Sequence, residues 1–172
     1  RHLHLVHLAR AWRLTGDDDN AVEAWSAKTI KAMRIAVRRL RMDLRIFGAY
    51  YKRKPLRQMA KGAKTLADAL REPREMDMLL AGARAYQESC DEEGARALDA
   101  LVADWKKQRA EAKQALRAYL QSDAHAAWHQ TLSEFVADED DGGMRQPAVG
   151  EPSLVRHAVH AMLWQHIADV RA

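Results

Sequence analysis

The sequence contains a single cysteine, Cys90, among 172 residues. One thiol cannot form an internal disulfide, which excludes a disulfide-stapled framework and favours a reducing compartment. The sequence also has no uninterrupted apolar run long enough to cross a bilayer, and no signal-peptide pattern. These absences predict a soluble cytoplasmic protein that does not insert into a membrane.

Glycine and proline are scarce as well, with eight and four residues, whereas hydrophobic residues make up 48% and charged residues 30% of the chain. A composition rich in Ala, Leu and Arg and poor in helix breakers favours α-helices. The length suffices for a sizeable core and suggests one domain. We therefore expect an all-α fold, built as an antiparallel helical bundle.

The net charge of +4 conceals an uneven distribution of charge along the chain. Residues 28–64 contain 13 Lys and Arg against Asp43 alone, so this segment carries +12 and the remainder of the chain carries −8. Solubility alone gains nothing from such segregation, whereas a local positive field attracts polyanions. The sequence therefore predicts a polyanionic partner.

Residues 28–47 are predicted to form an amphipathic helix with a row of cations beside its buried side. At 100° per residue, five basic residues fall on one narrow strip: Lys31, Arg34, Arg38, Arg41 and Arg45. The adjoining strip is apolar and consists of Ile30, Met33, Val37, Leu40, Leu44 and Phe47. The row spans about 21 Å at the usual helical rise, which suits a linear polyanion.

This row of cations has two other interpretations. A solvated helix face usually pairs acids with bases at i,i+4, but the single acid of the segment, Asp43, projects from the far side of the helix. An acidic helix elsewhere in the chain would also neutralise the row, and this intramolecular alternative stays open.

A second basic face is expected on the next helix. We expect the first helix to extend to about Tyr51, and Pro55 suits the first turn of the second. Apolar residues at helical spacing then leave Arg57, Lys61 and Lys64 on another face. Because the link is short, the two helices should pack antiparallel, which favours a cleft between cationic rows.

Three more helices are expected, from Pro73 to about Ser89, from a cap at Asp91 to about Leu120, and from about Asp123 to Val136. The helix from Asp91 to about Leu120 carries exposed cations, but interspersed acids dilute that patch, and we give it a secondary role. Its cations are Lys106, Lys107, Arg109, Lys113 and Arg117. Residues 1–14 are expected to form a helix tail, residues 137–152 an acidic loop, and residues 153–172 a last helix.

Catalytic and metal-binding patterns are weak. The pairs His125/His129 and His157/His160 have helical spacing but lack a third ligand, and HExxH, P-loop and GxGxxG patterns do not occur. Glu75 and Asp77 are two residues apart on a helix, so they do not face each other as an acid and base would. We expect no catalytic residue, no metal and no cofactor, and an inert Cys90.

Two segments resemble the CHAD family, the conserved histidine α-helical domains. The segment Lys31-Ala-Met-Arg34-Ile-Ala-Val-Arg38-Arg39-Leu-Arg41 resembles the family's H-x-M-R-V-A-x-R-R-L-R core. The segment Leu70-Arg-Glu-Pro-Arg74-Glu-Met-Asp77-Met-Leu-Leu80 resembles its L-G-x-x-R-D-x-D-V-L segment. The chain departs from the pattern at three positions: Lys31 replaces the namesake His, Arg71 the Gly and Glu75 the first Asp.

The resemblance implies a bundle of the CHAD type made of two helical repeats, of which this chain is expected to hold one repeat and the lead-in of the second. The expected parts are residues 1–136 for the first repeat, 137–152 for the acidic loop and 153–172 for the lead-in helix. Residues 156–166 loosely resemble the opening residues 1–12, which motivates this division.

The resemblance also implies a non-catalytic domain that binds inorganic polyphosphate and is associated with polyphosphate granules. RNA, DNA or a phosphoprotein is the alternative partner, although residues 28–46 contain no aromatic side chain for base stacking. An enzyme acting on polyphosphate is a third hypothesis, but the E-x-E-x-K motif of the triphosphate-processing domains that often accompany this family does not occur. The residues expected to bind the ligand are Lys31, Arg34, Arg38, Arg39, Arg41, Arg45, Lys52, Lys54, Arg57, Lys61, Lys64 and Arg74.

Overall fold

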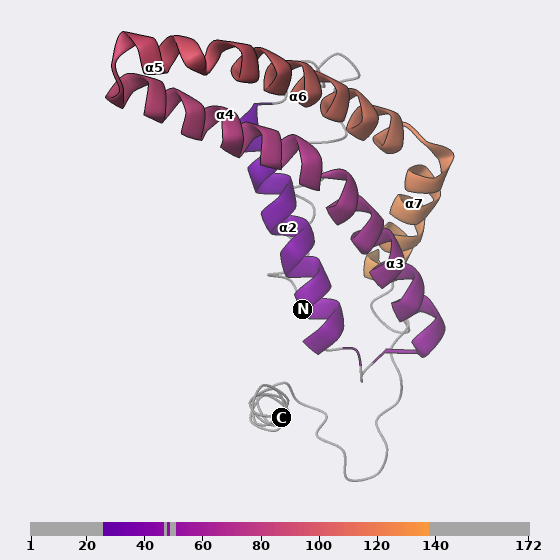
Figure 1. Ribbon diagram of the computed structural model, residues 1–172. Helices are drawn as coiled ribbons and strands as arrows, with labels where there is room; N and C mark the ends of the chain where they lie inside the picture. The colour runs from indigo at the N-terminus through magenta and orange to yellow at the C-terminus, as the bar shows by residue number, and fades with distance from the viewer. Residues whose placement is uncertain (1–25, 47, 49–50, 138–172) are drawn as a thin grey trace.

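The computed structural model describes residues 26–46, 48 and 51–137, which form α-helices joined by short links (Figure 1). The helices are α2 (Ala27–Ile46), α3 (Arg53–Ala69), α4 (Arg71–Ser89), α5 (Glu92–Ala97), α6 (Asp99–Leu120) and α7 (Asp123–Ala137). The prediction of an all-α bundle is confirmed. The helix tail, the acidic loop beyond Ala137 and the last helix, expected in residues 1–14, 137–152 and 153–172, lie outside the described residues. None of the described helices is long and apolar enough to cross a membrane.

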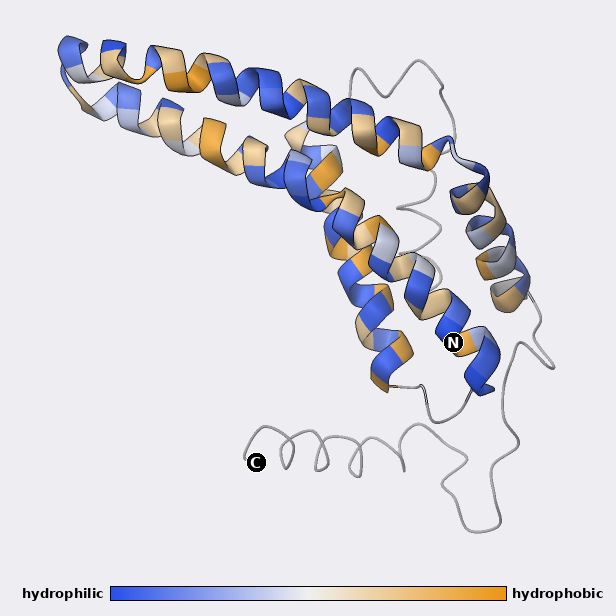
Figure 2. Ribbon diagram, turned by 45° about the vertical axis from the view of Figure 1, so that its right-hand side comes forward, coloured by the Kyte–Doolittle hydropathy of each residue, from blue (hydrophilic) through white to orange (hydrophobic). Residues whose placement is uncertain are grey.

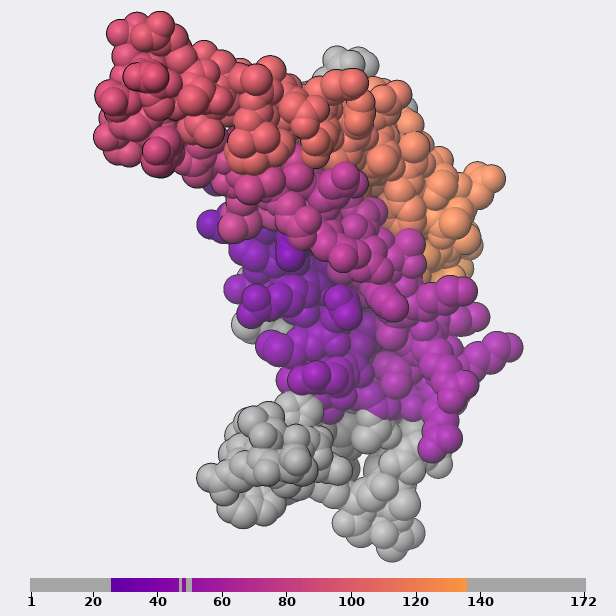
Figure 3. Space-filling model, viewed as in Figure 1, coloured from indigo at the N-terminus to yellow at the C-terminus, as the bar shows by residue number. Residues whose placement is uncertain are grey.

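The helices are arranged in two parts. In Figure 1, α2 and α3 run antiparallel with α7 beside α3, while α4 and α6 form a long antiparallel hairpin across one end of them. The tip of this hairpin carries α5 and projects from the body of the molecule, as the space-filling view shows (Figure 3). In Figure 2, hydrophobic and hydrophilic residues alternate along each described helix, as expected for amphipathic helices packed around cores.

The main core lies where α2 and α3 meet α7 and the carboxyl-terminal half of α6. All five described members of the predicted apolar strip of α2 are buried, which confirms the periodicity argument. Replacing one of these large side chains with Ala would cost about 2–5 kcal/mol. The buried cluster consists of Ile30, Met33, Val37, Leu40, Leu44, Met59, Ala63, Leu66, Leu70, Leu116, Trp128 and Leu132.

A smaller cluster holds the two arms of the hairpin together. It consists of the buried residues Leu80, Ala83 and Val102, with Leu98 and Trp105 packed against them. The hairpin therefore has apolar contacts of its own, apart from the main core.

The starts of α3 and α4 follow from proline. Pro55 and Pro73 are each the third residue of their helix, where the missing N–H has no intrahelical acceptor to lose. The first basic helix ends earlier than expected, at Ile46 instead of about Tyr51. The chain then turns tightly at Gly48, a poor helix former, whose carbonyl accepts a 3.2 Å hydrogen bond from the N–H of Tyr51.

The long helix expected from Asp91 to Leu120 is divided at Leu98 into α5 and α6, so that prediction was wrong at this point. Asp91 is the cap, since its side chain accepts a 2.9 Å hydrogen bond from the N–H of Gly94. At the break, Leu98 donates to the carbonyl of Ala95, which also accepts a hydrogen bond from the side chain of Gln87 on α4. The break thus lets Leu98 pack into the hairpin's own cluster while its backbone groups keep partners.

Candidate polyanion-binding surface

The first element of the candidate site is the row of cations on α2. Burial of the neighbouring apolar strip fixes the rotation of α2, and the five predicted cations are all exposed beside it. Lys31, which stands at the position of the family's histidine, is one of them. The positions predicted for this row are therefore accessible to a ligand.

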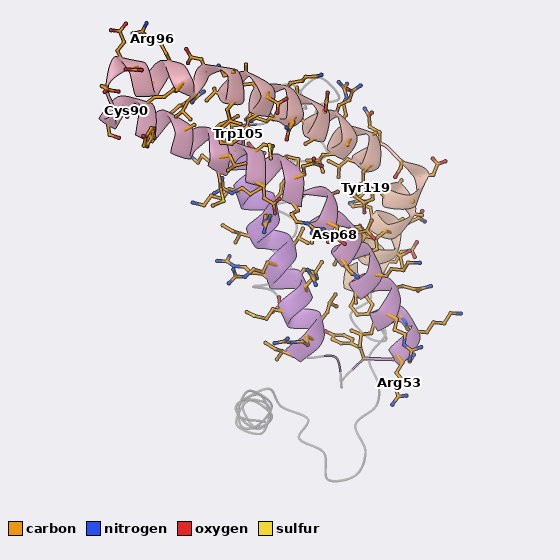
Figure 4. The ribbon with its side chains drawn as sticks, viewed as in Figure 1. Arg53, Asp68, Cys90, Arg96, Trp105 and Tyr119 are labelled. Atoms are coloured by element: carbon orange, nitrogen blue, oxygen red, sulfur yellow. The ribbon has the colours of Figure 1, made fainter. Side chains whose placement is uncertain are left out.

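The second element is the outward face of α3. Met59, Ala63 and Leu66 are buried, and the helix turns its basic residues away from them into solvent. Figure 4 shows Arg53 at the start of α3 pointing away from the bundle. The cleft expected between the two rows stays a prediction. The exposed cations on and just before α3 are Lys52, Arg53, Lys54, Arg57, Lys61 and Lys64.

All thirteen basic residues of positions 28–64 are exposed. Apart from Arg45 and Lys52, which have interactions of their own, these cations have no carboxylate within 4.0 Å among the described residues. The described ion pairs lie elsewhere, such as Arg71 with Asp68 and Arg96 with Glu92. Neutralisation by the described part of the chain is therefore not observed for the remaining eleven, which are Lys28, Lys31, Arg34, Arg38, Arg39, Arg41, Arg53, Lys54, Arg57, Lys61 and Lys64.

Arg74, the last residue of the predicted set, does not belong to either exposed row. It lies in the first turns of α4 and is half-buried. The helix α4 packs against α6 and also against α2 and α3.

A buried ion pair that sequence reasoning missed joins α4 to α6. The Nε of Arg109 donates to Oδ1 of Asp77 at 2.6 Å, and the side chains are 29% and 1% exposed, respectively. The expectation that Arg109 belongs to an exposed patch was wrong. The available signal was Asp77 itself, a charged residue on the strip of α4 that also carries the buried Pro73 and Leu80. Glu75 is exposed and does not join the pair, in keeping with its position two residues away.

Two of the five cations expected to be exposed on α6 are exposed, Lys106 and Lys107, and acids lie among them as expected. Glu111 lies 4.0 Å from Lys107, and Asp104 accepts a 2.7 Å hydrogen bond from Gln108. Three other cations of α6 are half-buried, namely Arg109, Lys113 and Arg117, and Arg109 faces α4 through its ion pair with Asp77. The pKa of Lys113 is lowered, first by burial and then by the charge of Arg109, with Asp77 acting in the opposite direction.

His125 is a core residue. Its ring packs against Tyr119 at 5.3 Å between centroids and against Trp128 at 5.9 Å. Burial lowers the pKa of His125. It also lowers the pKa of His129, which is less buried than His125. Within the part of the chain that the structure describes, no group of three or more His, Cys, Asp and Glu residues is placed to hold a metal ion. The pair His157 and His160 lies outside that part.

Comparison with protein-family models identifies the family of this chain. No curated protein is similar to this sequence at a significant level. The family model described as the CHAD domain matches residues 4–172, which is nearly the whole chain and includes both basic rows and the segment around Asp77. The protein therefore belongs to the CHAD domain family.

Proposed function

We propose that this protein is a non-catalytic module that binds inorganic polyphosphate along the cations of α2 and α3. The observation that carries the proposal is the set of eleven exposed cations without a carboxylate within 4.0 Å among the described residues. Lys and Arg donate charge-assisted hydrogen bonds to phosphate oxygens, and a helix repeats them at every turn. Such a surface matches a chain of closely spaced phosphates better than it matches a single charge.

Membership of the CHAD family supports the same ligand, because the family is linked to polyphosphate binding. Association with polyphosphate granules is part of the proposal, since a granule presents the same polymer at high density. No chemistry is needed for this role, so the protein would hold the polymer without cleaving it.

Nucleic acid fits the surface less well. Proteins that bind single strands add aromatic stacking to their charge, and α2 contains no aromatic residue. Tyr51, between the two helices, is half-buried and its ring packs on Phe135 at 5.1 Å between centroids, so part of its surface is already occupied. RNA or DNA would therefore bind α2 mainly through its phosphates, and a phosphoprotein would occupy only part of the row.

The decisive experiment is a competition between long-chain polyphosphate and RNA at matched phosphate concentration. We expect polyphosphate to displace RNA, and its affinity to fall with salt. If about five phosphates are contacted, the slope of log affinity against log salt should be roughly −3.5. RNA that resists displacement, or a slope near zero, would contradict the proposal.

A separate assay addresses catalysis. The protein incubated with polyphosphate, ATP or tripolyphosphate and Mg²⁺ or Mn²⁺ should release no phosphate above a blank. Release that scales with protein concentration and persists through further purification would show that the module is an enzyme.

A further inference from the structure

The large hydrophobic side chains that are exposed in the described part of the chain form a surface that polyphosphate does not explain. Each is at least 41% exposed, and they are Ile35 and Met42 on α2, Met78, Leu79 and Tyr86 on α4, and Leu101 on α6. Polyphosphate has no apolar group that would cover these side chains. Scattered apolar residues are ordinary on a protein surface, whereas apolar residues that gather in one place mark a site of contact.

Two contacts between side chains give the register of α4 against α6. Arg109 donates a hydrogen bond to Asp77, and Gln87 donates a 3.2 Å hydrogen bond to Asp99. Moving forward on α4 from position 77 to 87 therefore corresponds to moving back on α6 from position 109 to 99, as expected for an antiparallel hairpin (Figure 1). In this register, position 86 of α4 is level with position 100 of α6.

Three of the exposed hydrophobic side chains lie on one side of this hairpin. Leu79 and Leu101 each come directly before a buried residue of the hairpin's own cluster, Leu80 and Val102 respectively. A two-fold axis relates the facing sides of two antiparallel helices, so equivalent positions on them lie on the same side of the pair. Tyr86 is seven residues after Leu79, which keeps it on that side of α4 and next to the level of Leu101. We call this the apolar side of the hairpin, defined by Leu79, Tyr86 and Leu101.

The charges of the hairpin are divided between its two sides. Residues three, four or seven apart share a helix face, and on the apolar side these positions of α4 and α6 hold acids but no Lys or Arg. The acids are Glu72, Asp104 and Glu111, of which Glu111 lies 4.0 Å from Lys107. On the opposite side, the acids Glu88 and Asp99 are outnumbered by Arg71, Arg74, Lys106, Lys113 and Arg117. The apolar side therefore suits a partner whose apolar side chains lie among cations.

The outer side of α2 has this combination of residues. Ile35 and Met42 lie opposite the buried strip of α2, and Arg38 and Arg39 project on either side of them. Ile35 and Met42 are seven residues apart, about 10 Å along the helix, which is also the spacing of the two residues that α4 contributes to the apolar side. Within one chain the two surfaces are both exposed, so neither covers the other. They are therefore complementary between two copies of the chain.

We propose that the outer side of α2 in one copy docks on the apolar side of the hairpin in a second copy. Ile35 and Met42 pack against Leu79, Tyr86 and Leu101, while the cations of α2 meet the acids of the hairpin. Because the two surfaces differ, the contact is head to tail, and each pair keeps one free surface of each kind to which further copies add. One helix on one side of a hairpin buries less than about 1,200 Å², which is the range of weak, transient contacts. This self-association goes beyond the function proposed for the cations.

Sedimentation velocity of the whole protein over about a hundredfold range of concentration tests this contact. The average sedimentation coefficient should rise with concentration at low salt and rise much less at high salt, because opposite charges meet across the contact. A single species with the same coefficient at every concentration would overturn the proposal, whether the two surfaces are bare or are covered by another segment of the chain. Association that salt leaves unchanged would also contradict it.

Two variants, each with one altered surface, identify the two sides of the contact. Leu79→Gln/Tyr86→Gln alters the hairpin and Ile35→Gln/Met42→Gln alters α2, and each should raise the Kd of self-association at least about tenfold. An equal mixture of the two variants retains one intact contact, so it should form dimers and no longer assemblies. If the α2 variant associates as well as the unaltered protein does, or if the mixture does not associate, the head-to-tail contact is wrong.

Met78→Gln is the matched control, because Met78 is 58% exposed on α4 but lies away from the apolar side. This variant should associate as the unaltered protein does. Thermal unfolding shows whether each variant is folded, and the concentration and salt dependence of the unaltered protein stays a test if one is not. Both double variants should keep their affinity for long-chain polyphosphate, because neither removes a cation. A failure of the polyphosphate proposal would therefore be distinguishable from a failure of the self-association.

Discussion

The indole ring of Trp128 lies directly against the backbone of Gly62, in the space that a side chain at position 62 would occupy. The atoms of Trp128 concerned are Cγ, Cδ1 and Nε1. They are part of the rigid indole ring, so they cannot move aside without the whole ring moving. Gly62 is in α3 and Trp128 in α7. The glycine therefore sets how closely α7 approaches α3 at the main core.

Adding a methyl group at Gly62 should cost about 1–3 kcal/mol through overpacking, and removing a glycine from a helix should return about 1 kcal/mol. Gly62→Ala should therefore destabilise the protein by up to about 2 kcal/mol. Urea unfolding measures this difference. Gly82→Ala is the matched control, because Gly82 is also helical but a methyl group there meets nothing within 4 Å. We expect the control to gain about 0.5–1 kcal/mol. Equal stability of the two variants would show that α7 repacks freely.

Arg34→Ala combined with Arg38→Ala should weaken polyphosphate binding strongly and leave the melting temperature nearly unchanged. Each lost charged hydrogen bond should cost about 1.5–3 kcal/mol before neighbouring cations compensate. The fold should tolerate the change because both side chains are exposed and removing them relieves repulsion along the row. Fluorescence titration and thermal unfolding of the same preparation give the two quantities.

Arg84→Ala combined with Arg96→Ala is the control for that experiment. Both arginines are exposed and lie on the hairpin, where Arg96 is 3.7 Å from Glu92. Their loss should change polyphosphate affinity much less than the loss of Arg34 and Arg38. If the α2 variant melted early and bound normally, the row would be a structural feature and the assignment of the site would be wrong.

The Asp77–Arg109 pair should behave as a buried ion pair. Removing the cation by Arg109→Leu leaves a carboxylate that is 1% exposed without its partner, and the expected loss is about 3–5 kcal/mol. The double variant Asp77→Leu/Arg109→Leu should recover much of that stability, because no charge is left buried. Unfolding of both single variants and the double variant completes the cycle. Strictly additive losses would indicate that the two side chains do not interact.

Stability should fall in mild acid partly because of His125. Burial lowers its pKa below the ordinary 6.5, and a hydrogen bond to the backbone of Leu120 offsets this only in part. As the pH falls below about 6.5, the unfolded chain takes up the proton before the folded chain does, so folding loses free energy. The contribution of neutral His125 to the free energy of unfolding is complete above about pH 6.5 and is lost as the pH falls below it. Neighbouring His129 has its pKa shifted in the same direction and contributes likewise.

His125→Phe keeps an aromatic ring beside Tyr119 and Trp128 and removes the titrating group. Urea unfolding from about pH 8 to about pH 5 should then show a shallower loss of stability than in the unaltered protein. His129→Gln serves as a control for the second histidine. Parallel pH profiles for the His125 variant and the unaltered protein would exclude this role.

The features that the sequence predicts correctly are local ones, which depend only on residues close together in the chain. The buried strip of α2 and its exposed cations follow from a period of 3.6 residues, and the starts of α3 and α4 follow from Pro55 and Pro73. These features need no knowledge of where another helix lies. They also provided most of the candidate ligand residues.

The features that were missed depend on contacts between distant residues. Asp77 and Arg109 are 32 positions apart, and their pairing requires the register of α4 against α6. At the break near Leu98, the side chain of Gln87 on another helix donates a hydrogen bond to the carbonyl of Ala95. Hydrophobic periodicity describes one helix at a time. It therefore predicts that Arg109 lies on a helix, but it cannot predict that Arg109 pairs with Asp77 on another helix.

The hairpin's separate cluster has a consequence for how the molecule opens. Only Leu80, Ala83 and Val102 are buried there, far fewer than in the main core. Local unfolding of the tip therefore costs less free energy than global unfolding, and it leaves α2 and α3 packed. Amide hydrogen exchange should proceed through this sub-global opening in α5 and the adjoining end of α4, while the buried amides of α2 exchange only when the whole domain unfolds. A polymer bound along α2 and α3 could thus stay attached while the far end of the hairpin opens and closes.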